Sequence, residues 1–103
     1  MPNLDVNPAL IRIFDQNPAI SKVVVFGSRA KGTNSDYSDV DISLYGDIDF
    51  LETERVASAL EDLPTAFKYD VLAYSEIKNP RLKEHIDRVG LIIYERAPTA
   101  VAR

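Results

Sequence analysis

The stretch VVVFGSRAKGTNSDYSDVDISLYG, residues 23–46, contains the features that decide the fold of this chain. It begins inside an apolar, β-branched run at residues 22–26, which is typical of a buried strand. Gly27 and Ser28 end that strand, and Ser28 can cap a short helix. We therefore expect a strand that leads through a tight turn into a helix.

The second half of the stretch predicts another strand with two different faces. Residues 32–38 are polar and turn-like, whereas residues 40–45 alternate between apolar and polar side chains. The expected apolar face holds Val40, Ile42 and Leu44, and the opposite face holds Asp39, Asp41 and Ser43. Two aspartates on an apolar strand require an explanation, because burying an unpaired carboxylate is costly.

Asp39 and Asp41 leave the same face of the strand, with Cα atoms about 6.5 Å apart. Two carboxylates held in this way repel each other unless a cation lies between them. Oxygen ligands of this kind suit Mg²⁺ or Mn²⁺, and Mg²⁺ commonly binds one or two carboxylates together with substrate phosphates. The alternative for an isolated Asp-x-Asp is a solvated strand end.

The Gly27-Ser28 turn has a phosphate-binding interpretation and a simpler one. Glycine lets a ligand approach the backbone closely, and the N-terminus of the following helix offers unpaired N–H groups to an anion. Arg29 and Lys31 flank the turn and could attract an anionic ligand, or they could be ordinary surface residues. Taken alone, Gly-Ser is more often a plain turn.

Asp70 adds a third acid within FKYDVLAY, residues 67–74, which we expect to be a strand. If that strand neighbours the one carrying Asp39 and Asp41, three carboxylates converge. Three carboxylates can hold two divalent ions about 4 Å apart, as in phosphoryl and nucleotidyl transfer. The alternative for Asp70 alone is an exposed residue at a strand edge.

The remaining segments alternate between helix and strand patterns. Asn7-Pro8, Asp49 with Glu52, and Asn79-Pro80 are start signals for three further helices. We expect these helices to end near residues 16, 62 and 90, with Gly90 as a C′ glycine, and a last strand at residues 91–94. This alternation predicts an α/β (α+β) fold, with helices flanking a small sheet.

Size and composition restrict the function further. The chain has 103 residues, so we expect one domain over residues 1–96 and a flexible tail at 97–103. Because it has no cysteine, we expect neither disulfides nor thiolate metal sites. Because the formal net charge is −4, we do not expect the chain to bind nucleic acid directly. The sequence shows no signal-peptide pattern and no membrane-length apolar run, so a cytoplasmic location is expected.

Taken together, Gly27-Ser28, ten intervening residues, Asp39-x-Asp41 and a later Asp70 resemble the nucleotidyltransferase superfamily that includes DNA polymerase β. The stretch GSRAKGTNSDYSDVDISL and the segment NPRLKEHIDRVGLIIYER are similar to its minimal branch, the MNT proteins. The resemblance covers roughly residues 20–96. It implies the nucleotidyltransferase fold.

The resemblance also implies roles for individual residues. Asp39 and Asp41 would bind both of two Mg²⁺ ions, and Asp70 would bind the catalytic ion and help to deprotonate the acceptor hydroxyl. Gly27 and Ser28 would hold the β- and γ-phosphates of ATP. The reaction would be in-line attack on the α-phosphate with release of pyrophosphate.

MNT proteins are typically paired with a HEPN-domain toxin, which implies that this chain is an antitoxin that transfers AMP from ATP to a tyrosine of its partner (AMPylation). Two alternatives stay open: a binding module that neutralises its partner by contact alone, and a transferase acting on a small molecule or an RNA end. The resemblance leaves open whether the chain forms a homo-oligomer or a hetero-oligomer. His85, the single histidine, is expected to be structural or exposed.

Overall fold

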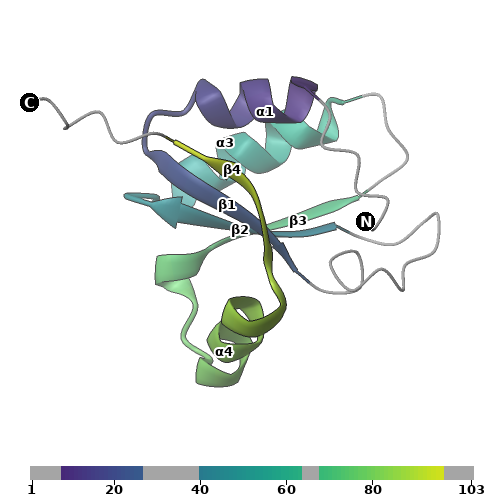
Figure 1. Ribbon diagram of the computed structural model, residues 1–103. Helices are drawn as coiled ribbons and strands as arrows, with labels where there is room; N and C mark the ends of the chain where they lie inside the picture. The colour runs from purple at the N-terminus through teal and green to yellow at the C-terminus, as the bar shows by residue number, and fades with distance from the viewer. Residues whose placement is uncertain (1–7, 27–39, 64–67, 97–103) are drawn as a thin grey trace, which may run out of the picture.

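The computed structural model describes residues 8–26, 40–63 and 68–96, which form a four-stranded sheet with helices on both faces (Figure 1). The strands are β1 (Ile20–Phe26), β2 (Val40–Gly46), β3 (Tyr69–Ala73) and β4 (Leu91–Glu95). The helices are α1 (Pro8–Asp15), α3 (Phe50–Glu61) and α4 (Pro80–Val89), with a 3₁₀ turn, η1 (Tyr74–Glu76). The predicted class, helices on a small mixed sheet, is confirmed. The predicted helix over residues 28–31 and the tail at 97–103 lie outside the described residues.

The sheet has the strand order β3-β2-β1-β4 and is mixed. β1 pairs antiparallel with β2 and with β4, whereas β2 pairs parallel with β3. A parallel pair needs a crossover connection, and α3 lies between β2 and β3 in the chain. Consequently β3 and β4 are the two edge strands, and β2 lies next to β3.

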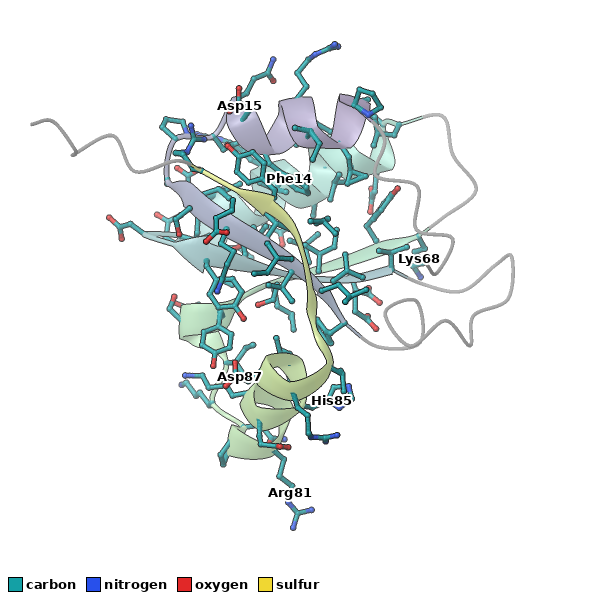
Figure 2. The ribbon with its side chains drawn as sticks, in the orientation of Figure 1. Phe14, Asp15, Lys68, Arg81, His85 and Asp87 are labelled. Carbon is teal, nitrogen blue, oxygen red and sulfur yellow. The ribbon has the colours of Figure 1, made fainter. Side chains whose placement is uncertain are left out.

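The larger core lies between the sheet and the α1/α3 layer. Phe14 points from α1 into this layer, where its ring centroid lies 5.8 Å from that of Tyr94 (Figure 2). On α3 the buried stripe consists of Thr53, Val56 and Leu60, which are spaced three and four residues apart. Leu51 lies off this stripe and is 66% exposed.

A smaller core lies on the opposite face, where Ile86 of α4 packs against Val24 and Phe26 of β1. Gly90 is the C-cap of α4, but its φ of −69° is not the left-handed conformation expected of a C′ glycine. A Cβ at Gly90 would lie 2.4 Å from Cγ1 of Val24. Glycine is therefore needed here because the end of α4 approaches β1 closely.

The helix starts expected from the sequence are present where the structure describes them. The Asp49 carboxylate accepts a hydrogen bond from the Glu52 N–H at 2.8 Å, and the Asn79 side chain accepts one from the Arg81 N–H at 2.9 Å. Within residues 8–26, 40–63 and 68–96, no helix has the length and apolar character needed to cross a membrane.

Candidate active site

One end of the sheet brings together two of the residues that the sequence singled out, Asp41 and Asp70. β1 ends at Phe26, β2 begins at Val40, and β3 begins at Tyr69. Asp41 pairs with Phe26 of β1 on one side and with Asp70 of β3 on the other. Neighbouring strands lie about 4.8 Å apart, so Asp41 and Asp70 are direct neighbours. The condition set by the sequence analysis, that the strand carrying Asp70 neighbours the strand carrying Asp41, is met.

Both acids leave the face of the sheet that carries α4. The flanking residues Val40 and Ile42 belong to the larger core on the other face, and side chains alternate along a strand. Asp41 is half-buried and Asp70 is exposed. Like charges directly opposite each other in a sheet are destabilising, and a bound cation relieves that repulsion. Two carboxylates in this register therefore fit a hard divalent ion such as Mg²⁺.

The other predicted site residues lie outside the described part of the chain: Gly27, Ser28, Arg29, Lys31 and Asp39. In the sequence Gly27 follows the last residue of β1 and Asp39 precedes the first residue of β2. Among residues 8–26, 40–63 and 68–96, no group of three or more His, Cys, Asp or Glu side chains is placed to hold a metal ion. The three-acid site thus stays a prediction.

His85 lies at this end of the sheet, against the last residue of β1. Its ring meets that of Phe26 edge-on, with centroids 6.4 Å apart and an interplanar angle of 80°. Phe26 is the partner of Asp41, so this contact sets α4 against the sheet next to the acid pair. Figure 2 shows His85 and Asp87 leaving α4 on opposite sides. No sequence signal could reveal this, because it depends on how α4 packs on β1.

The far end of the same face is a structural cluster. The rings of Tyr45 and Tyr74 stack with centroids 4.5 Å apart, and Lys22 lies over the Tyr45 ring at 4.4 Å. The Tyr74 hydroxyl donates to the Asp87 carboxylate of α4 at 3.0 Å, and this hydrogen bond raises the pKa of Tyr74. The cluster holds η1 and α4 on the sheet at the end opposite the acids.

Sequence comparison places this chain in a known family. The model of the polymerase beta nucleotidyltransferase family matches residues 9–99, which include every described strand and helix except the first residue of α1. This chain is a polymerase beta-type nucleotidyltransferase. The resemblance carried by the Gly-Ser turn and the Asp-x-Asp pair is therefore confirmed.

This nucleotidyltransferase is similar in sequence to a named relative and in fold to a solved structure. It is 30% identical over 79 residues to a Haemophilus influenzae protein named "Probable protein adenylyltransferase MntA", covering 75% of this chain and 68% of that protein. Its fold matches a chain in a crystal structure of a toxin–antitoxin with AMP-PNP at a TM-score of 0.70 and 22% identity, covering 90% of this chain and 75% of that chain.

A second structural match belongs to the complex of a tri-AMPylated Shewanella oneidensis HEPN toxin with an MNT antitoxin. The TM-score is 0.60 at 19% identity, covering 93% of this nucleotidyltransferase and 74% of that chain. At such identities these structures show the shared fold. The fold class and the nucleotidyltransferase assignment agree with the expectations from the sequence.

Proposed function

We propose that this nucleotidyltransferase transfers AMP from ATP to a hydroxyl group of a HEPN-domain toxin, expected to be that of a tyrosine, and so acts as its antitoxin. The observation that carries the proposal is the register pairing of Asp41 with Asp70 at the sheet end where β1 stops. Family membership supports the reaction type. The named adenylyltransferase relative and the AMPylated toxin complex support the acceptor class.

In this proposal Asp41 and Asp70 have different roles. Asp41, half-buried between Phe26 and Asp70, would hold Mg²⁺ together with Asp39 and Asp70. When bound, two Mg²⁺ ions neutralise phosphate charge and lower the pKa of the acceptor hydroxyl. Asp70 is exposed on β3 and is therefore the acid that an incoming acceptor can reach.

The covalent change balances with these groups. A bond forms between the acceptor oxygen and the α-phosphorus of ATP, and the bond from that phosphorus to the bridging oxygen of the β-phosphate breaks. Pyrophosphate leaves, and Asp70 accepts the hydroxyl proton. In the proposal Gly27 and Ser28 bind the β- and γ-phosphates, and Arg29 and Lys31 attract ATP to the site.

The test is the intact mass of a HEPN-domain protein co-expressed with the unmutated chain or with its Asp39→Asn/Asp41→Asn variant. We expect the partner to gain one or more AMP units only with the unmutated chain. Asp47→Asn is the matched control, because Asp47 is an exposed acid beyond the other end of β2. A partner that is neutralised without gaining mass would establish the contact-only antitoxin instead.

A further inference from the structure

The outer edge of β3 has backbone groups that β2 does not use. The Val40 N–H donates to the Lys68 carbonyl at 2.7 Å, and Val40 pairs with Tyr69. In a parallel pair this means that residues 68, 70 and 72 turn their backbone groups toward β2. Because the direction alternates along a strand, the N–H and C=O groups of Tyr69, Val71 and Ala73 point away from it.

A hollow lies on each face of this edge. The first hollow, on the α4 side, has a volume of about 230 Å³ and includes Ile77 and Leu82 in its lining. The second, on the α3 side, has a volume of about 220 Å³ and includes Phe50 and Val71. Leu72, Ala73 and Glu76 line both hollows. The two hollows therefore flank one short length of β3.

The surroundings of the edge are unusually apolar for exposed positions. Phe50 is 71% exposed and Leu72 is 36% exposed, and both line the hollow on the α3 side. An extended peptide added to a sheet edge sends alternate side chains to opposite faces, and pockets for those side chains provide specificity. One hollow on each face is the arrangement that such an added strand requires.

We propose that the acceptor segment of the protein partner binds by adding to β3 as a further strand, with its hydroxyl side chain beside Asp70. This inference rests on the proposed function. The occupant follows from continuity with the acid pair, because Asp70 and Leu72 share a face and lie about 6.6 Å apart along the strand.

The geometry specifies the sequence of that segment. The residue next to the acceptor faces the α3 side and enters the hollow at Phe50 and Val71. The residue two positions from the acceptor faces the α4 side and enters the hollow at Ile77 and Leu82. The segment is therefore a hydroxyl residue with two successive apolar residues on one side of it. Glu54 and Glu76 outnumber Lys78 among the charged residues of the two hollows, which favours a basic residue nearby.

The experiment measures hydrogen exchange of the Asp39→Asn/Asp41→Asn chain, alone and bound to the HEPN-domain protein used in the mass assay. This variant lacks two acids proposed for AMP transfer, so the measurement reports partner binding without modification of the partner. We expect the amides of Val71 and Ala73 to exchange rapidly in the free chain and to slow at least tenfold in the complex. The amides of β4, on the other edge of the sheet, are the internal reference and should keep their free rates.

Leu72→Glu tests the same surface by affinity. We expect it to weaken partner binding at least tenfold, because Leu72 lines both hollows. Ile92→Glu is the matched control, since Ile92 is a 56% exposed apolar residue on the opposite edge strand. It should leave the dissociation constant within twofold. Circular dichroism and a urea melt of both variants show whether each is folded.

The outcomes separate this inference from the proposed function. Protection of β3 in the exchange experiment, together with a partner that gains no AMP from the unmutated chain in the mass assay, supports the docking surface and overturns the AMP transfer. A partner that gains AMP while β3 exchanges unchanged and Leu72→Glu binds normally overturns the docking surface alone. Light scattering shows whether the free chain is a dimer. If it is, and if β3 is already protected from exchange in that dimer, the proposed docking surface is overturned, because a second copy then occupies the edge.

Discussion

Replacing Asp70 with Asn should strongly slow AMP transfer and at the same time stabilise the free protein. Asp70 pairs directly with Asp41 on the neighbouring strand, so the substitution removes one member of a like-charge pair. Cross-strand charge pairs contribute about 0.2–1 kcal/mol, and the exposure of Asp70 places the gain within that range. For a domain of this size the gain corresponds to a rise in Tm of about 1–8 °C. Loss of the acid that accepts the proton should lower the rate of transfer at least about 100-fold.

Mg²⁺ provides the second readout of this prediction. A ligand that binds only the folded state stabilises it by RT ln(1 + [L]/Kd), which is about 1.4 kcal/mol at ten times Kd. We expect Mg²⁺ to raise the Tm of the unmutated chain and to raise that of Asp70→Asn much less. Calorimetric melts with and without Mg²⁺ measure both effects, with Asp47→Asn as the control for simple loss of charge. The reasoning would be refuted if Asp70→Asn had a lower Tm than the unmutated chain without Mg²⁺, or if Mg²⁺ raised the Tm of both equally.

Three further predictions concern the frame around the site. Gly90→Ala should lower the free energy of unfolding by about 1–3 kcal/mol in urea melts, because its Cβ would lie 2.4 Å from Val24; an unchanged midpoint contradicts the close approach. Asp49→Ala should cost about 1 kcal/mol by the same assay, and Asp49→Asn much less, because the side chain caps α3. The hydrogen bond to Asp87 raises the pKa of Tyr74 above its usual 10.0, so the stability it contributes is present below pH 10 and is lost as the pH rises through the folded-state pKa. Tyr74→Phe should therefore make the decline in urea stability between pH 9 and 11 less steep; an unaltered decline excludes this contribution.

The local sequence determined most of the elements and the chemistry. Alternation in residues 40–45 predicted which side chains of β2 face the larger core, and the start signals at Asp49 and Asn79 predicted where α3 and α4 begin. These features depend on neighbours a few residues away, so a linear pattern contains them. The combination of a Gly-Ser turn with Asp39-x-Asp41 was likewise a linear pattern, and it identified the family.

The tertiary structure decided everything that depends on which strands become neighbours. Asp41 and Asp70 are 29 positions apart in the chain, and only the parallel pairing of β2 with β3 brings them into register. The same pairing leaves β3 at an edge with a hollow on each face, and the packing of α4 places His85 on Phe26. Strand order and helix packing result from burying apolar faces over the whole chain, and no single segment contains that information. The sequence by itself therefore determined what the acids could do, and the fold determined that two of them lie side by side.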